Sequence, residues 1–229
     1  MPDHLPPLKI IARIRTDFPS KFGIPRQSGL ADTTARIVFE PEYRMPEALR
    51  GLEEYSHLWL IWFFSESARA GWSPTVRPPR LGGNRRMGVF ATRSPFRPNP
   101  LALSSVRLTG VETTKEEGTV LIVSGADLMD GTPILDIKPY LPFTDSHPEA
   151  LSGFAGRVQQ DALDVRFPDI LLEKIPADKR PALLEILRED PRPHYHSDPE
   201  RIYGFPFAGY EVRFQVADAV LTVVEVKRI

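Results

Sequence analysis

Apolar positions in the first 145 residues recur in short runs, and several of these runs alternate apolar with polar side chains. Prolines, glycines and charged residues separate the runs. Such spacing is typical of an antiparallel sheet, because successive side chains of a strand point to opposite faces. We therefore expect strands in six segments: 8–14, 35–40, 57–64, 88–92, 101–111 and 119–126.

Two stretches between these runs have a different character. Residues 46–50 favour a short helical turn, and residues 72–86 read WSPTVRPPRLGGNRR. Prolines and glycines are too frequent in the second stretch for a regular helix or strand. We expect a long exposed loop there, and long loops in compact domains are often functional.

The pattern changes near residues 144–157, where turn-forming residues gather. Helix-like segments follow at 168–175 and 178–190. In the second of these, Asp178 can cap the helix and Pro181 falls in its first turn. This part of the chain therefore predicts helices where the preceding part predicts strands.

The C-terminal residues predict a β-hairpin. Two alternating segments, 210–216 and 219–227, flank a turn that we expect at Ala217 and Asp218. We find no internal repeat and no low-complexity tract.

These patterns predict a mainly β protein, with a β-rich domain over residues 1–145 and a small C-terminal α+β domain over residues 150–229. The chain has 229 residues, 41% of them hydrophobic, which is enough to bury a sizeable core. It has no cysteine, which excludes disulfides, thiolate zinc sites and a cysteine nucleophile. The longest apolar run, 58–64, is too short to cross a bilayer, and the first residues lack the apolar core of a signal peptide. We expect a cytoplasmic protein with no membrane role.

The formal net charge of -1 conceals a local excess of arginine. Between Ser67 and Val111, a segment that we call the arginine tract, there is no Asp, Glu or Lys, but there are eight arginines: Arg69, Arg77, Arg80, Arg85, Arg86, Arg93, Arg97 and Arg107. A planar guanidinium matches phosphate or carboxylate oxygens in a bidentate way that an ammonium does not. The tract predicts an anionic partner; the alternative is a solvated face that balances the acidic remainder.

The usual nucleotide-binding motifs are absent. The sequence has no G-x-G, no Walker loop and no G-x-S-x-G elbow. The acidic segment 127–136 fails the spacing of a calcium loop, and His194 and His196 have no evident third ligand. We therefore expect neither a Rossmann-type nucleotide site nor a metal site.

Five ordered motifs do converge on one family: PRQSG at 25–29, SHLWLIWFF at 56–64, RPPRLGG at 77–83, GVFATRSPFRPNP at 88–100 and DGTPILDIKPYLP at 130–142. Together they resemble the TrmO family, also called TsaA-like or YaeB-like, over about residues 8–145. The segment DPRPHY at 190–195 is similar to DPRPAY in the C-terminal extension of its bacterial branch. The resemblance implies a single-sheet antiparallel β-barrel followed by the small α+β domain.

Members of this family are S-adenosylmethionine-dependent tRNA methyltransferases. They methylate N6 of threonylcarbamoyladenosine next to the anticodon, in tRNA that reads threonine codons. They are homodimers with the cofactor near the subunit interface. The resemblance therefore implies S-adenosylmethionine as cofactor, the tRNA anticodon arm as partner, and a homodimer without a metal.

The resemblance also implies which residues bind the cofactor. They lie in the PRQ motif, directly after the apolar strand 57–64, at positions 93 and 103, and in the loop 128–131: Pro25, Arg26, Gln27, Ser65, Glu66, Arg93, Leu103, Leu128, Met129, Asp130 and Gly131. Relatives often carry His-Gln where this chain has Ser65 and Glu66. Taken singly, Asp130 and Gly131 also fit a hairpin turn, as Pro98 to Pro100 fit a tight turn.

RNA-binding residues are expected in the arginine tract and in the stiff loop near residue 192: Arg77, Arg80, Arg85, Arg86, Arg97, Arg192 and Tyr195. Arginines meet phosphates, and an aromatic ring can stack on an unpaired base. We expect the C-terminal domain to position the anticodon arm and to leave cofactor binding to the barrel. The alternative is that the stiff loop packs this domain onto the barrel.

The methyl group of a sulfonium is already electrophilic, so the protein must align the nitrogen and accept its proton. Asp136, Asp130, Tyr140 and a water molecule remain open as acceptors, and no catalytic residue is assigned. We expect His57 to be a hydrogen-bonded core histidine. Two other functions stay open: a non-catalytic module that binds S-adenosylmethionine or RNA, and a hydrolase that uses the carboxylates Asp127, Asp130 and Asp136.

Overall fold

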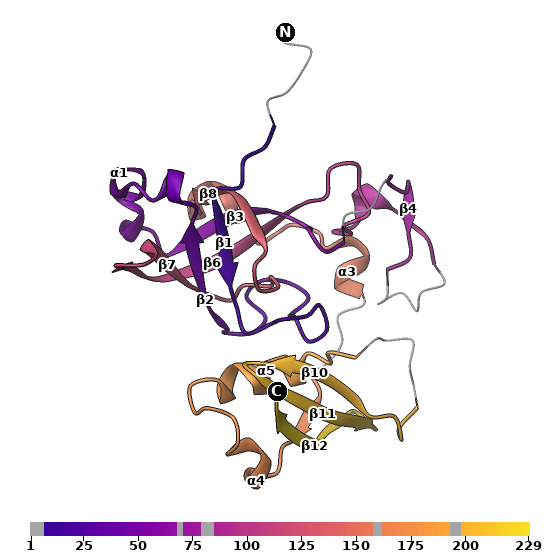
Figure 1. The fold of residues 1–229 in the computed structure, drawn as a ribbon. Coiled ribbons are helices and arrows are strands. Elements are labelled where there is room, and N and C mark those ends of the chain that lie inside the picture. The colour runs from indigo at the N-terminus through magenta and orange to yellow at the C-terminus, as the bar shows by residue number, and fades with distance from the viewer. Residues whose placement is uncertain (1–6, 68–70, 79–84, 158–161, 193–197) are drawn as a thin grey trace.

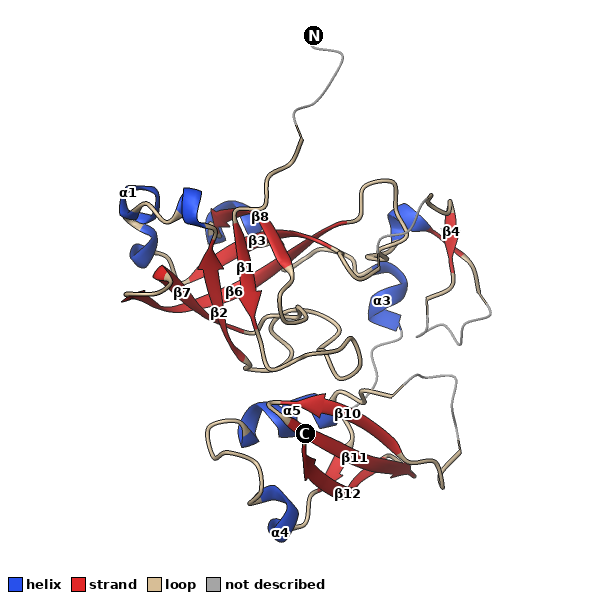
Figure 2. Cartoon of the chain, in the orientation of Figure 1, coloured by secondary structure: helices blue, strands red, loops and turns tan. Residues whose placement is uncertain are grey.

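The structure is a computed structural model that describes residues 7–67, 71–78, 85–157, 162–192 and 198–229. Figure 1 shows two bodies, one built from the N-terminal strands and one from the yellow and orange C-terminal elements. Most of the regular elements along the described chain are strands (Figure 2). The prediction of a mainly β protein is confirmed.

Six antiparallel strands form the N-terminal body: β1 (Ala12–Arg15), β2 (Thr34–Phe39), β3 (His57–Phe63), β6 (Leu101–Thr114), β7 (Gly118–Ser124) and β8 (Pro133–Pro139). They pair in the order β1-β2-β7-β6-β3-β8, and β8 returns to β1, so the sheet closes into a barrel. Closure leaves no long unpaired edge.

Alternation along the strands decides which side chains fill the barrel. In β3, Leu58, Leu60 and Trp62 point inward and are buried, while the residues between them are more exposed. Ser104 of β6 lies opposite Leu60, so it is a polar side chain on an inward face. The apolar core consists of Ala12, Ile14, Ala35, Ile37, Phe39, Leu58, Leu60, Trp62, Val106, Leu121, Val123, Ala126, Leu128 and Ile134.

Short elements connect the barrel strands. Before β3 lie η1 (Pro41–Tyr43), α1 (Pro46–Leu49) and η2 (Leu52–Glu54), so the helical turn predicted at 46–50 is confirmed. After β8 come α2 (Pro142–Asp145) and α3 (Gly153–Arg157).

The segment between β3 and β6 extends to one side of the barrel (Figure 2). It holds two two-residue strands, β4 (Thr75–Val76) and β5 (Met87–Gly88), and the 3₁₀ helix η4 (Val89–Ala91). The strand predicted at 88–92 is therefore wrong beyond Gly88, because Val89 is buried by a tight helical turn and Thr92 closes that turn with a bond to the Val89 carbonyl. Sequence patterning also missed β8, whose polar and proline positions hide its alternation.

The C-terminal body is an α+β unit. Its sheet has the order β10-β11-β12-β9, with β9 (Asp164–Arg166) parallel to β12 (Val220–Arg228) and the others antiparallel: β10 (Tyr203–Phe207) and β11 (Tyr210–Ala217). The predicted hairpin is confirmed, but its turn lies one residue later than predicted: Ala217 pairs with Val220, and Asp218 (φ 48°) and Ala219 (φ 63°) form the tight turn. Sequence patterning missed β9 and β10.

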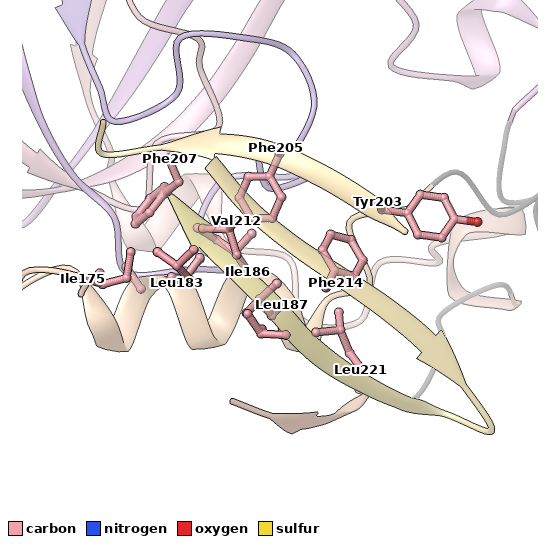
Figure 3. Close-up of a cluster of buried hydrophobic side chains, with 14 of the residues drawn as sticks. Ile175, Leu183, Ile186, Leu187, Tyr203, Phe205, Phe207, Val212, Phe214 and Leu221 are labelled. Carbon is pink, nitrogen blue, oxygen red and sulfur yellow. The ribbon is translucent and has the colours of Figure 1, made fainter. Parts of the chain in front are cut away.

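Helix α5 (Arg180–Arg188) covers one face of this sheet, and α4 (Asp169–Leu172) precedes it. In Figure 3, Leu183, Ile186 and Leu187 of α5 lie against Phe205 and Phe214 of the strands. Pro181 is in the first turn, as predicted. The N-cap is Lys179 with no side-chain capping bond, so the predicted cap at Asp178 is wrong.

Residues 16–33, the loop between β1 and β2, join the two bodies. Phe18 and Ala31 of this loop are buried in the core of the C-terminal body. The backbone N–H of Ala208 donates to the Asp17 carbonyl at 3.0 Å, and Lys179 Nζ donates to Asp17 Oδ2 at 2.6 Å. The loop connects two strands of the barrel, and it also packs against the C-terminal body.

Candidate active site

A cavity of about 270 Å³ lies where the β1–β2 loop meets the end of β3 and the segment after β7. Its walls are both apolar and polar: Lys21, Ile24, Pro25, Trp62, Phe63, Phe64, Ser65, Glu66, Ser67, Asp127, Met129 and Thr132. Three segments far apart in the chain therefore converge here. Lys21 Nζ donates to the backbone carbonyl of Glu66 and ties two of them together.

Four of the residues predicted to bind a cofactor line this cavity: Pro25, Ser65, Glu66 and Met129. Two more adjoin it. Arg93 donates to the side-chain oxygen of Gln27, and its charge acts on the carboxylate of Asp127 in the cavity wall. The fold thus brings together these predicted cofactor-binding positions: 25, 27, 65, 66, 93 and 129.

Arg26 and Leu103 point elsewhere. Arg26 donates to the backbone carbonyls of Asp190 at 2.6 Å and Arg192 at 3.3 Å, so its guanidinium lies against the C-terminal body. Leu103 is 52% exposed on the outer face of β6, because its neighbour Ser104 occupies the inward position. Neither lines the cavity.

The loop 128–131 supports the barrel more than it faces the cavity. Leu128 is buried in the barrel core, and the Asp130 carboxylate accepts from the Thr16 backbone N–H at 3.0 Å. Gly131 has φ of 77°, and its N–H donates to the Ile14 carbonyl. Only Met129 of this loop lines the cavity wall.

Asp127 is the residue that sequence reasoning missed as part of this cavity. Its Oδ1 accepts from Ser104 Oγ at 2.6 Å, and Ser104 Oγ accepts from Trp62 Nε1 at 2.9 Å. Burial raises the pKa of the Asp127 carboxyl, while the Ser104 hydrogen bond and the Arg93 charge oppose that rise. The available signal was its place as the first charged residue after the apolar run 119–126.

The proton acceptors left open by the sequence lie outside the cavity lining. Asp136 pairs with Lys138 at 2.8 Å, and Asp130 is held by Thr16 as described. Tyr140 packs its ring against Trp59, with ring centroids 5.3 Å apart.

A larger cavity of about 460 Å³ lies on the outer side of β3, β6 and β7, where α5 approaches the barrel. Its charged groups have hydrogen-bond partners: Arg107 donates to both oxygens of Asp32 at 2.9 Å, and Glu185 accepts from the Asp32 backbone N–H at 2.7 Å. Because it holds none of the predicted cofactor residues, we place the chemistry in the smaller cavity.

His57 lies at the edge of this larger cavity. It is exposed at the first position of β3, with Nδ1 2.9 Å from Ser56 Oγ. The prediction of a core histidine is wrong, because the inward positions of β3 begin one residue later, at Leu58.

The described part of the arginine tract places Arg77, Arg85 and Arg86 at the surface. Arg97 is half-buried and donates to the Thr92 carbonyl at 3.3 Å. Trp72 and Phe90, both exposed, stack nearby with ring centroids 6.3 Å apart. Arg80 lies outside the described residues.

In the C-terminal loop, Arg192 is half-buried and its Nε donates to both carboxylate oxygens of Asp190, at 3.0 and 3.1 Å. Arg26 is also bound to this segment. The described residues of the loop therefore fit the alternative in which the loop packs the C-terminal domain onto the barrel. Tyr195, His194 and His196 lie outside the described residues.

Comparison with known proteins gives the family. A model of the tRNA-methyltransferase O N-terminal domain matches residues 13–146, and one of the TrmO C-terminal domain matches residues 160–229. The chain belongs to the tRNA-methyltransferase O family. The sequence resemblance to this family is confirmed.

Relatives within the TrmO family match most of the chain. The tRNA (adenine(37)-N6)-methyltransferase of Escherichia coli is 42% identical over 218 residues, covering 91% of this chain and 92% of the relative. The protein of the same name from Eikenella corrodens is 50% identical over 163 residues, covering 71% and 91%. The crystal structure of TrmO from Pseudomonas aeruginosa has a TM-score of 0.76 and 32% identity, covering 97% of this chain and 99% of that one.

The residues of the smaller cavity suit the methyl donor of this family. S-adenosylmethionine carries a flat adenine, a sulfonium and an amino-acid carboxylate. The apolar walls at Pro25 and Met129 can contact the adenine, and the aromatic side chains of Trp62 and Phe64, with ring centroids 4.5 Å apart, line the same cavity. Arg93 offers the charged fork that a carboxylate requires.

Among the described residues, no three His, Cys, Asp or Glu side chains are grouped closely enough to hold a metal ion. In the same part of the chain, no helix has the length and apolar character that a membrane span requires.

Proposed function

We propose that this protein transfers a methyl group from S-adenosylmethionine to N6 of adenosine 37 in tRNA, and that the acceptor adenosine carries a threonylcarbamoyl group. The observation that carries the proposal is the convergence of Pro25, Ser65, Glu66 and Met129 on one cavity, next to Arg93 and Gln27. Relatives that match most of the chain are named for this reaction.

The chain's own part in the reaction is to bind and to orient. The β1–β2 loop and the end of β3 hold the donor between apolar walls, and Arg93 holds its carboxylate. Aligning two reactants in this way can supply about 7–11 kcal/mol of the barrier. S-adenosylmethionine is consumed as the methyl donor, so the protein needs no metal to make the carbon electrophilic.

The arginine tract is the proposed tRNA surface. Arg77, Arg85 and Arg86 are exposed in a segment without acidic residues, and such single-sign surfaces attract polyanions. The exposed rings of Trp72 and Phe90 add a place where an unpaired base can stack. Binding should therefore weaken steeply as salt is added.

A homodimer is the proposed assembly, and the exposed apolar side chain of Leu103 supports it because a second copy would cover it. The cytoplasm, where tRNA is modified, is the proposed location.

The test is direct transfer of label. Purified protein is incubated with methyl-labelled S-adenosylmethionine and tRNA from cells that lack this methylation, and the nucleosides are separated after digestion. We expect label on N6 of the adenosine at position 37, and none on an unmodified transcript that lacks the threonylcarbamoyl group. Binding of S-adenosylmethionine without any transfer would instead indicate a non-catalytic binding module.

A further inference from the structure

Two carboxylates line the smaller cavity, Asp127 and Glu66. They differ in setting. Glu66 is exposed in the turn after β3, whereas Asp127 is half-buried and follows a strand whose last residues are buried. A carboxylate in a partly dry cavity without a full ion pair lowers the stability of the fold, so Asp127 is a candidate for a chemical role.

Asp127 is held in place by a short relay of side chains. Trp62 Nε1 can only donate, so it fixes Ser104 Oγ as its acceptor at 2.9 Å. The Ser104 hydroxyl proton is then directed to Asp127 Oδ1 at 2.6 Å. The three residues come from β3, β6 and the segment after β7, so the barrel itself orients this carboxylate.

The relay also sets what the carboxylate can do. Because Ser104 donates to it, Asp127 Oδ1 acts as an acceptor, and a carboxylate has about four lone-pair sites in all. The backbone N–H groups of Ser28 and of Asp127 itself also interact with it. Acceptor capacity remains, and the residue lines the cavity wall.

We propose that Asp127 is the catalytic residue that accepts the proton lost from N6 of the substrate adenosine. This inference rests on the proposed function. It replaces Asp136, Asp130 and Tyr140 as candidates, because none of these three lines the cavity.

The step balances. The nitrogen lone pair forms the new bond to the methyl carbon, the carbon–sulfur pair stays on sulfur, and the N–H proton moves to the Asp127 carboxylate. The sulfonium charge and the carboxylate charge disappear together, which leaves a neutral thioether, a neutral carboxylic acid and a methylated nitrogen. Water then takes the proton from the acid.

The electrostatic setting suits a base. Burial raises the pKa of Asp127, which makes its ionised form a stronger base than an ordinary aspartate, while Ser104 and Arg93 limit that rise. Among the described residues, the other charged groups that line the cavity are Lys21 and Glu66, and Lys21 is bound to the Glu66 backbone carbonyl. Activity should therefore fall as the pH falls through the raised pKa.

The first test compares wild-type protein with Asp127→Asn, which keeps the shape and removes the base. We expect kcat to fall by about 100-fold or more. Calorimetry should show the Kd for S-adenosylmethionine changing by less than about tenfold, because the loss of a charge-assisted bond to the ligand would change it by about tenfold or more. If kcat is unchanged, or if the Kd weakens as much as kcat/KM falls, Asp127 is not the base. Absence of methyl transfer by the wild-type protein overturns the proposed function itself.

The second test uses the pH profile and does not depend on the folding of Asp127→Asn. Ser104→Ala removes a bond that lowers the pKa of Asp127, so the acid limb of kcat/KM should move to higher pH. The matched control is Ser105→Ala, whose side chain lies on the outer face of β6 and should leave the limb in place. In the free wild-type protein, ¹³C NMR titration of the Asp127 carboxyl should give the midpoint of that limb. A different midpoint, or an unmoved limb in Ser104→Ala, overturns the inference.

Discussion

Arg93 stands between two acceptors of different kinds, the side-chain oxygen of Gln27 and the negative charge of Asp127. Its side chain is exposed, so it can reach a ligand without leaving a buried charge behind. The contact proposed between Arg93 and the cofactor would therefore come from a proline-rich corner outside the segments that line the cavity. In that proposal, the Gln27 bond orients the guanidinium before the ligand arrives, which lowers the entropy lost on binding.

Replacing Arg93 by alanine should weaken binding of S-adenosylmethionine at least about tenfold, since a charge-assisted hydrogen bond contributes roughly 1.5–3 kcal/mol. Isothermal calorimetry measures this Kd. Arg77→Ala is the matched control, because Arg77 is an exposed arginine of the same tract that does not line the cavity. Equal affinities in wild type and Arg93→Ala would remove Arg93 from the cofactor site.

At the scale of elements, the β1–β2 loop does two things at once. Its residues 21, 24 and 25 line the cavity, while Phe18, Phe22 and Ile24 pack on the C-terminal core. Gly23 lies between these contacts with φ of 92°, and a Cβ there would overlap the ring of Phe205. The loop conformation thus requires glycine at position 23, because Phe205 of the C-terminal body occupies the space that a side chain would need.

Gly23→Ala should lower the free energy of unfolding by at least about 2 kcal/mol, from the left-handed backbone and the overlap with Phe205 together. It should also weaken binding of S-adenosylmethionine, because Pro25 and Ile24 move with the loop. Gly51→Ala provides the comparison: its φ is 86°, but nothing lies near the added Cβ, so it carries the backbone cost alone. Denaturant unfolding and calorimetry measure both effects, and similar values for the two variants would show that the Phe205 contact is unimportant.

At the scale of the whole molecule, the C-terminal body holds the loop between β1 and β2 in place. It buries Phe18 and Ala31, pairs Lys179 with Asp17 and receives the guanidinium of Arg26. The sequence predicts that cofactor binding is independent of this body, and that stays a prediction. The loop that carries PRQ packs into the C-terminal core, which favours a different outcome.

A chain ending at Ser146 should therefore bind S-adenosylmethionine more weakly than the full chain. Truncation exposes the apolar side chains of Phe18, Phe22 and Ile24, and the loop loses the contacts that fix it. Circular dichroism reports whether the strands persist, and calorimetry reports the Kd. Undiminished affinity in a folded truncated protein would return cofactor binding to the barrel alone.

Local patterns predicted much of this fold correctly. Alternation along β3 and the hairpin before β12 are properties of a few neighbouring residues, so the sequence shows them, although the hairpin turn lies one residue later than predicted. Patterning failed at residues 89–91, where a 3₁₀ turn replaces a strand, and at β8, where prolines and charges break the apolar rhythm. In both cases long-range packing outweighed local preference.

The sequence by itself determined the family, the mainly β class and most of the segments that meet at the cavity, because motifs and side-chain periodicity are local. Only the tertiary structure decided that Asp127 is oriented by Ser104, 23 residues away, and that Arg26 turns toward Asp190, 164 residues away. Periodicity states which face of a strand is buried. It does not state which distant polar group will meet that face, since the closing of the barrel and the packing of the C-terminal body bring those groups together.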